Sequence, residues 1–212
     1  MDWLIRSGIK PNTITTFGTG LVLLSALAYG VGAIRVGGLL LLLSGVVDTL
    51  DGQVARDGAM VTKFGAFYDS TLDRIGDGAT FIGIGAFLLT APEVGFRDQA
   101  VVTCMVAILA SLLVSYARAR AEGLGIECKV GIAQRAERIV LLGGASLLVG
   151  PGPHAFVLEA IVALLAVASI ITVVQRFVYV HQHAEGRAPG VAVRAADPAP
   201  KARALDTIAK GS

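Results

Sequence analysis

Six long apolar segments constrain the fold of this 212-residue chain more than any other feature. They cover approximately residues 12–32, 36–56, 63–91, 99–122, 132–150 and 154–182, and glycine, proline or charged residues separate them. A helix needs about 20 mostly apolar residues to span the hydrocarbon core of a bilayer. With 54% hydrophobic and only 16% charged residues, and a mean hydropathy of +0.71, the chain is too apolar for a water-soluble domain. The sequence therefore predicts an all-α integral membrane protein with six transmembrane helices.

The two ends of the chain differ from this apolar body. We expect residues 1–9, with the sequence MDWLIRSGI, to form a short interfacial helix that turns Trp3 and Ile5 toward lipid. After about residue 184 the composition changes to Ala, Pro, Gly and charged residues, which cannot bury a core. We therefore expect one six-helix transmembrane domain over residues 1–184 and a disordered tail over residues 185–212.

Lysine and arginine placement predicts the orientation in the membrane. Alternate connectors carry Arg35 alone, Arg97 alone and no basic residue, whereas the opposite connectors and both termini hold the other cations. Cytoplasmic loops carry the excess of Lys and Arg, so both termini should be cytoplasmic in a multi-pass protein of the cell membrane. The net charge of only +2 gives no reason to expect a nucleic-acid partner.

Four aspartates interrupt the second and third apolar segments. Asp48 and Asp51 are three residues apart, and Asp69 and Asp73 are four apart. Residues at these spacings lie along one face of a helix, so each helix should present one stripe of carboxylates. A charged side chain inside a span costs about 2.5–3.5 kcal/mol on insertion scales. Four clustered acids are therefore hard to explain as solvated surface residues and indicate a functional site.

Bound cations are the simplest way to tolerate such a cluster. Like charges at helical spacing repel, so the carboxylates need to be protonated or neutralised by cations. The all-oxygen ligand set, with no nearby Cys or His, favours Mg²⁺, Mn²⁺ or Ca²⁺ over zinc. We expect Asp77, one turn beyond Asp73, to pair with Arg74 or orient a polar neighbour rather than to serve as a fifth ligand.

Arg56 and the small residues between the acids complete a recognisable pattern. Arg56 lies one turn from Gly52, and its guanidinium could neutralise the acids or clamp a phosphate. The segment 48–73 resembles the CDP-alcohol phosphotransferase signature D-x2-D-G-x2-A-R-x8-G-x3-D-x3-D. Every fixed position of that signature is present, as Asp48, Asp51, Gly52, Ala55, Arg56, Gly65, Asp69 and Asp73.

This resemblance implies a fold, a reaction and a set of site residues. Members of the family are six-helix membrane enzymes, usually homodimeric, that join a CDP-linked lipid or alcohol to a second alcohol and release CMP. The resemblance implies two Mg²⁺ ions, with Mn²⁺ as the alternative, held by Asp48, Asp51, Asp69 and Asp73. It further implies that Asp73 is the general base, that Gly52 and Arg56 bind the CDP-lipid, and that Pro11, Asn12 and Thr62 lie on the nucleotide side. Two ions about 3.5–4 Å apart can clamp a diphosphate, and a carboxylate can take the proton of an attacking alcohol.

Three looser motifs concern the acceptor alcohol. DRIGDG, SYARARAE and RAER in this chain resemble the actinobacterial phosphatidylinositol phosphate synthases, which join CDP-diacylglycerol to inositol 3-phosphate. By family position, the acceptor phosphate pocket would be lined by Ser115, Arg118, Arg135 and Arg176. Arg138 could take the place of Arg135 if the register shifts by one turn. The first basic position is commonly Lys in that subfamily, and Arg118 keeps the charge but alters the donor geometry.

The arginines fit an anionic acceptor on their own chemistry, although other roles are open. Arg176 lies in the apolar run ITVVQRFVYV, so it should face a polar cavity, a carboxylate or an anionic substrate. Arg118 also fits cytoplasmic anchoring, and Glu122 or Glu137 could pair with one of the arginines.

Three functional hypotheses result. The first is a phosphatidylinositol phosphate synthase acting on CDP-diacylglycerol and inositol 3-phosphate. The second is another enzyme of the same reaction, with glycerol 3-phosphate as acceptor or an archaeal-type CDP-lipid as donor. The third is a metal-ion transporter, because buried carboxylates also mark ion pathways. A transporter should distribute its carboxylates along several spans, whereas these four lie on two helices beside glycines and Arg56, which favours an enzyme.

Overall fold

The computed structural model describes residues 11–57, 62–92 and 94–185, and its regular elements in these ranges are all helices. They follow in the order α2 (Pro11–Gly30), α3 (Ile34–Asp57), α4 (Lys63–Thr90), α5 (Arg97–Gly123), α6 (Arg135–Leu148), the 3-10 turn η1 (Pro153–Ala155) and α7 (Phe156–Glu185). This order confirms the predicted all-α fold. The predicted interfacial helix at residues 1–9 and residues 186–212 of the predicted tail lie outside the described ranges.

Helix lengths separate α6 from its neighbours. Three stretches of the described chain are long and apolar enough to cross a membrane, namely Pro11–Gly30, Arg97–Gly123 and Pro153–Ala184. Helices α3 and α4 have 24 and 28 residues and carry the aspartates. Helix α6 has only 14 residues, about 21 Å at 1.5 Å per residue, which is shorter than a hydrocarbon core of about 30 Å. The expected span 132–150 extends beyond both ends of the observed helix, which covers Arg135–Leu148.

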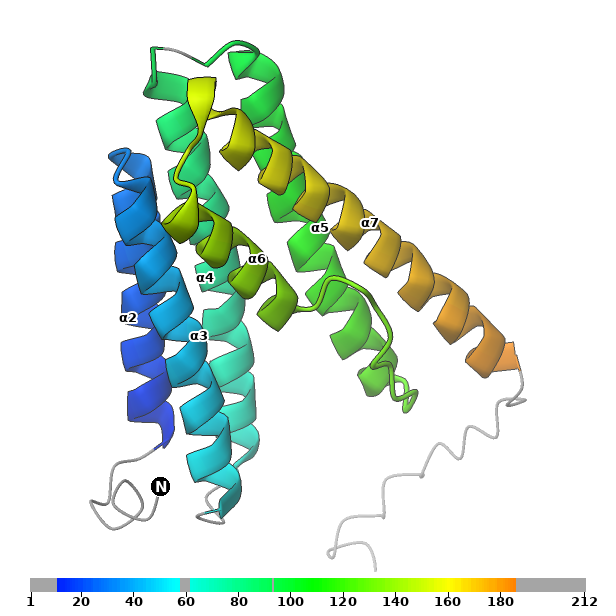
Figure 1. Cartoon of the computed structure of the whole chain (residues 1–212). Coiled ribbons are helices and arrows are strands. Elements are labelled where there is room, and N and C mark those ends of the chain that lie inside the picture. Colours follow the sequence, from blue (N-terminus) through cyan, green and yellow to red (C-terminus); the bar gives the residue numbers. More distant parts are fainter. Residues whose placement is uncertain (1–10, 58–61, 93, 186–212) are drawn as a thin grey trace, which may run out of the picture.

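Helix α2 is the centre of the first half of the bundle, and α3 and α4 both pack against it (Figure 1). The buried Ser25 hydroxyl on α2 donates a 2.7 Å hydrogen bond to the Gly37 carbonyl on α3. On the other side, α4 approaches α2 so closely that a Cβ added to Gly83 would lie 2.1 Å from the Ala26 carbonyl oxygen. Small residues commonly permit such close helix contacts in membranes.

The second half of the bundle is built around the pair α5 and α7. Helix α5 also packs on α4, while the short α6 packs on α3. In Figure 1, α2, α3 and α4 run side by side, and α7 inclines away from them. Large apolar side chains such as Met105 and Phe177 are 62% and 69% exposed. Such an apolar surface suits lipid rather than water, and the chain is a membrane protein.

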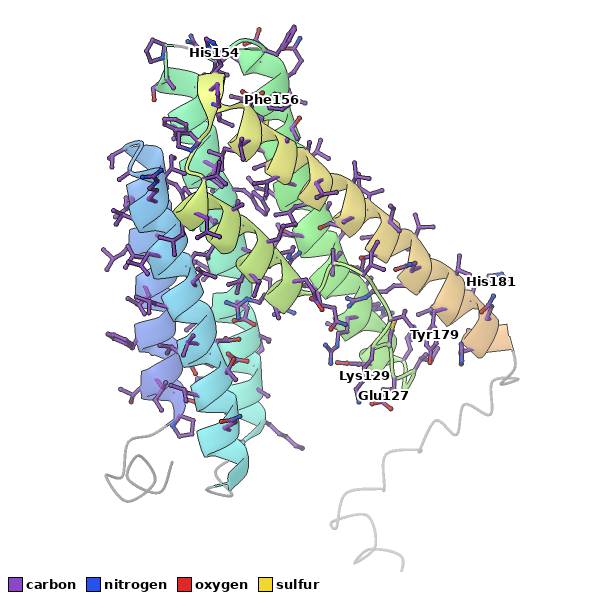
Figure 2. The ribbon with its side chains drawn as sticks, in the orientation of Figure 1. Glu127, Lys129, His154, Phe156, Tyr179 and His181 are labelled. Atoms are coloured by element: carbon purple, nitrogen blue, oxygen red, sulfur yellow. The ribbon has the colours of Figure 1, made fainter. Side chains whose placement is uncertain are left out.

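The connector between α5 and α6, residues 124–134, is fixed by α7. The Ala133 amide donates a 3.0 Å hydrogen bond to the Thr172 hydroxyl, and the Arg176 guanidinium donates to the Val130 carbonyl at 2.9 Å. Gly131 has φ +138, and a Cβ there would lie 2.3 Å from Thr172 Cγ2. These contacts hold the chain extended up to residue 134 and set the start of α6 at Arg135. Figure 2 shows Glu127 and Lys129 of this connector at the same end of the molecule as Tyr179, opposite His154.

Candidate active site

Three of the predicted metal ligands meet where α3 and α4 face each other. Asp48 comes from α3, and Asp69 and Asp73 come from successive turns of α4. Each offers one carboxylate oxygen, and these atoms all lie within 4.8 Å of one another. The structure thus brings Asp48 of α3 together with Asp69 and Asp73, which lie on one face of α4. The side chain of the fourth predicted ligand, Asp51, lies outside the described part of the chain.

The residues present fit a divalent cation. Asp69 Oδ1 is buried and has no hydrogen-bond partner among the described residues, although buried polar atoms are normally paired. Asp48 and Asp69 repel each other electrostatically. Hard cations such as Mg²⁺ and Mn²⁺ prefer carboxylate oxygens as ligands. A bound cation would pair with the Oδ1 atom of Asp69 and reduce the repulsion between the carboxylates.

Arg135 joins this cluster from α6. Its Nη1 atom lies 2.7 Å from Asp48 Oδ1 and 2.8 Å from Asp73 Oδ1, so one guanidinium nitrogen bridges α3 and α4. Arg135 is the first residue of α6, and the connector fixed on α7 delivers it to the carboxylates. The family resemblance implied a place for Arg135 in the acceptor pocket, and its contact with the metal ligands was not predicted.

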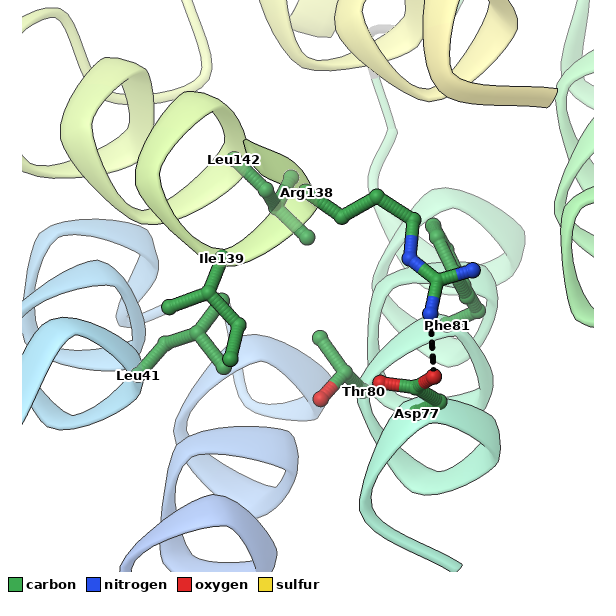
Figure 3. A pocket seen from close by; sticks show the side chains of 7 residues that line it. All are labelled: Leu41, Asp77, Thr80, Phe81, Arg138, Ile139 and Leu142. Carbon is green, nitrogen blue, oxygen red and sulfur yellow. Dashed lines mark hydrogen bonds and ion pairs between the residues drawn. The ribbon is translucent and has the colours of Figure 1, made fainter. Parts of the chain in front are cut away.

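A second arginine of α6 forms a buried ion pair beside the cluster. Arg138 Nη2 lies 2.5 Å from Asp77 Oδ2, and the two side chains are only 5% and 13% exposed (Figure 3). Arg135 Nε lies 3.7 Å from Asp77 Oδ1. The expected partner of Asp77, Arg74, instead donates to the Ser70 carbonyl of its own helix. Asp77 thus orients polar neighbours on α6 rather than Arg74.

The other predicted acceptor residues lie on α5 and α7. Arg118 donates a 2.8 Å hydrogen bond to Glu122 on the next turn, which confirms the local pairing considered above. Arg176 is 3% exposed and donates to the carbonyls of Val130 and Val114. Main-chain carbonyls are partners that the sequence analysis did not consider for Arg176.

These arginines lie close to one another. Arg118 and Arg138 are near enough to Arg176 to repel it electrostatically, so α5, α6 and α7 together form a basic region beside the acidic cluster. Ser115 lies one turn before Arg118 on α5 and is half-buried. The predicted acceptor residues therefore come from three helices, and Arg135 and Arg138 are the ones that contact the aspartates.

Two of the predicted nucleotide-side residues, Thr62 and Asn12, lie together at the start of α4. The Thr62 hydroxyl caps this helix by accepting a 2.9 Å hydrogen bond from the Gly65 amide. A Cβ added to Gly65 would lie 2.9 Å from Thr62 Oγ1 and 3.3 Å from Asn12 Oδ1, so Asn12 of α2 adjoins this cap. Pro11 begins α2, and Gly52 lies on α3. The side chain of Arg56 lies outside the described part of the chain.

Sequence reasoning missed two contacts that shape this site. The Tyr68 hydroxyl on α4 lies 3.0 Å from the Thr16 hydroxyl on α2, next to the nucleotide-side residues. Asp77 continues the stripe of Asp69 and Asp73 at helical spacing, a signal that could have indicated its place beside the cluster. Its pairing with Arg138 spans 61 residues and has no local signature.

Comparisons with known proteins agree with this geometry. A family model described as CDP-alcohol phosphatidyltransferase matches residues 9–187. The archaetidylinositol phosphate synthase of Methanothermobacter thermautotrophicus is 42% identical over 177 residues, which are 84% of this chain and 86% of that protein.

Two solved structures of phosphatidylinositol phosphate synthase from Mycobacterium tuberculosis also match. The complex with manganese and citrate gives a TM-score of 0.74 at 33% identity and covers 85% of this chain and 86% of that one. The complex with CDP-DAG gives a TM-score of 0.73 at 34% identity and covers 84% of this chain and 90% of that one. The family match over nearly all of the helical part, together with these relatives, shows that the chain belongs to the CDP-alcohol phosphatidyltransferase family.

Proposed function

We propose that this enzyme is a phosphatidylinositol phosphate synthase, which transfers the phosphatidyl group of CDP-diacylglycerol to inositol 3-phosphate and releases CMP. The observation that carries the proposal is the basic region of α5, α6 and α7 next to the acidic cluster of α3 and α4. A basic region beside a cation-binding site suits an acceptor that carries its own phosphate. The names of the relatives, archaetidylinositol phosphate synthase and phosphatidylinositol phosphate synthase, support the same acceptor.

The reaction assigns distinct roles to the residues. Asp48, Asp51, Asp69 and Asp73 would hold the two divalent ions, which would supply positive charge for the diphosphate and for the attacked phosphorus. Asp73 takes the proton of the acceptor hydroxyl, whose oxygen forms a bond to the lipid-linked phosphorus of the donor. The bond from that phosphorus to the CMP oxygen breaks, and CMP leaves with the electron pair.

Binding of the two substrates falls to different helices. Pro11, Asn12, Gly52, Arg56 and Thr62 hold the CDP part of the donor near the start of α2 and the end of α3. Ser115, Arg118, Arg135, Arg138 and Arg176 form the pocket for the acceptor phosphate. Bidentate contacts to phosphate are a usual function of arginine, and three of these arginines already lie close together.

The donor lipid has one alternative. The archaeal relative is named for an archaetidyl product, whereas the mycobacterial structure contains CDP-DAG. An archaeal-type CDP-lipid therefore stays the second candidate donor, and glycerol 3-phosphate the second candidate acceptor. Family membership makes the chain a metal-dependent transferase of phosphatidyl groups, which removes the metal-ion transporter hypothesis.

The orientation and assembly are part of the proposal. We infer that both termini and the active site face the cytoplasm, because most Lys and Arg residues lie in the connectors and termini at that end. A homodimer in the membrane is expected from the family resemblance. Cross-linking of the purified protein in bilayers tests the dimer, and labelling of single introduced cysteines from either side tests the orientation.

An acceptor panel tests the reaction. Purified protein is incubated with CDP-diacylglycerol, Mg²⁺ and either inositol 3-phosphate, inositol or glycerol 3-phosphate, and CMP release is measured. We expect release with inositol 3-phosphate alone and its loss in Asp73→Asn, with the helical circular dichroism of that variant retained. CMP release with glycerol 3-phosphate but not with inositol 3-phosphate would disprove the acceptor assignment.

A further inference from the structure

Arg135 lies between two sets of carboxylates. Its Nη1 atom contacts Asp48 and Asp73 at 2.7 and 2.8 Å, and both belong to the group that can hold a cation. Its Nε atom points to Asp77, which is not part of that group, at 3.7 Å. This Nε atom is buried and has no hydrogen-bond partner among the described residues. The Nε–H group of Arg135 therefore lacks an acceptor in the described part of the chain, and Asp77 Oδ1 lies just beyond hydrogen-bond distance.

A divalent cation and Arg135 compete for the same two carboxylates, Asp48 and Asp73. Mg²⁺ binds carboxylate oxygens at about 2.0–2.1 Å, and a guanidinium in contact with those oxygens would be repelled by the ion. Arg135 must then move away from Asp48 and Asp73 when they bind metal. A free guanidinium in this partly buried place needs another anionic partner, and a small movement of Nε would close the gap to Asp77.

The ion pair with Arg138 holds Asp77 in a position where it can accept the guanidinium of Arg135. The 2.5 Å contact between Asp77 and Arg138 is almost completely buried, and the two side chains line a small pocket together with Thr80, Phe81, Ile139 and Leu142 (Figure 3). One Asp77 oxygen accepts from Arg138, and the other faces Arg135. The carboxylate thus has one oxygen committed and one available.

We propose that Asp77, held by Arg138, is a positioning residue that gives Arg135 a second docking point, so that the guanidinium withdraws from Asp48 and Asp73 when metal binds. The inference deepens the proposed function, on which it rests for its last step. Arg135 docked on Asp77 lies next to the metal ligands and is available to the acceptor phosphate. Metal loading and acceptor binding are then coupled through one side chain.

A double-mutant cycle tests the docking without any substrate. The ion pair is replaced by uncharged amides, Asp77→Asn with Arg138→Gln, which keeps the net charge of the site unchanged. Mn²⁺ affinity is measured on the purified protein by the electron paramagnetic resonance signal of free Mn²⁺. The same double substitution is then made in an Arg135→Gln background. The cycle isolates the effect of the pair that passes through Arg135.

The docking role predicts a change in only one background. With Arg135 present, loss of its second docking point should weaken Mn²⁺ binding by about three- to tenfold, a usual coupling between contacting residues. With Arg135→Gln, the same replacement should leave Mn²⁺ affinity unchanged. Equal weakening in both backgrounds, or no weakening in either, would overturn the proposal.

Controls separate this role from folding and from the reaction. Glu137→Gln removes an exposed carboxylate from the first turn of α6 and should not change Mn²⁺ affinity. If the amide pair does not fold, Asp77→Glu keeps the charge but displaces the carboxylate, and should weaken Mn²⁺ binding only with Arg135 present. The amide pair should also raise the acceptor KM more than it lowers kcat. The Mn²⁺ cycle can succeed even if the acceptor assignment fails, so the two failures are distinguishable.

Discussion

Replacing Asp69 by Asn should make the metal-free protein more stable and at the same time remove its response to metal. Asp69 Oδ1 is buried without a hydrogen-bond partner, and its nearest carboxylates are within 4.8 Å. Two unit charges at that separation repel by about 3.5 kcal/mol at an effective dielectric constant of about 20. Arg135 and Arg74 offset part of this repulsion. An uncharged Asn amide can also donate to a neighbouring carboxylate, so we expect a net gain of about 1–2 kcal/mol.

Thermal unfolding in detergent, followed by circular dichroism with EDTA present, measures this gain. For a chain of this size, 1 kcal/mol corresponds to about 2–4 °C in Tm, so the variant should melt about 2–8 °C higher. Added Mn²⁺ should reverse the order. A ligand at about 100 times its Kd stabilises by about 2.7 kcal/mol, and a variant that lacks one metal ligand should gain much less.

The control for this experiment is Glu137→Gln, an amide replacement of an exposed carboxylate. Surface substitutions of this kind usually change stability by less than about 0.5 kcal/mol. If Asp69→Asn melted at or below the wild-type temperature in EDTA, the carboxylates would not be held together under repulsion. If it kept the full gain with Mn²⁺, Asp69 would not be a metal ligand.

Three further substitutions test the packing that positions the site. Gly65→Ala places a Cβ 2.9 Å from Thr62 Oγ1, so it should displace the cap of α4 and raise the KM for CDP-diacylglycerol several-fold with little change in kcat. Gly83→Ala meets the Ala26 carbonyl at 2.1 Å and should cost about 1–3 kcal/mol of stability, the usual cost of overpacking. Gly78→Ala on the same helix meets nothing within 4 Å and is the control for both. Thr172→Val leaves the Ala133 amide without its acceptor and should cost about 1–3 kcal/mol, and a Tm equal to wild type would contradict that contact.

The helices and the aspartates were predictable because their signals are local. Apolar runs broken by glycine and charge locate each span, and the spacing of Asp69 and Asp73 places both on one face of α4. The expectation that Glu122 or Glu137 pairs with one of the arginines also rests on local spacing, and Arg118 and Glu122, which do pair, are four residues apart. The start of α6 was expected three residues too early. It depends on the hydrogen bond between Ala133 and Thr172, 39 residues apart.

The partners of the arginines depend on tertiary structure. Arg135 and Asp48 are 87 residues apart, and Arg138 and Asp77 are 61 apart. The sequence predicted that these arginines bind an anion. Their positive charge alone fits either a phosphate or a carboxylate as that anion. Only the placement of α6 beside both α3 and α4 decides which carboxylates they meet.

Arg176 of α7 anchors the connector that precedes α6, and its substitution by Met tests that role. Its guanidinium donates to the Val130 carbonyl in the connector and to the Val114 carbonyl on α5. Lys129, the residue before Val130, has an exposed side chain. Methionine has no donor, so both carbonyls lose a charge-assisted bond, each worth about 1.5–3 kcal/mol. The connector should open more often, and trypsin cleavage after Lys129 should become about tenfold faster or more, because slow cleavage follows the population of the open form. Gln175→Met, on the adjacent exposed position, is the matched control. No substrate is present in this assay, so an unchanged cleavage rate in Arg176→Met would show that Arg176 does not anchor the connector.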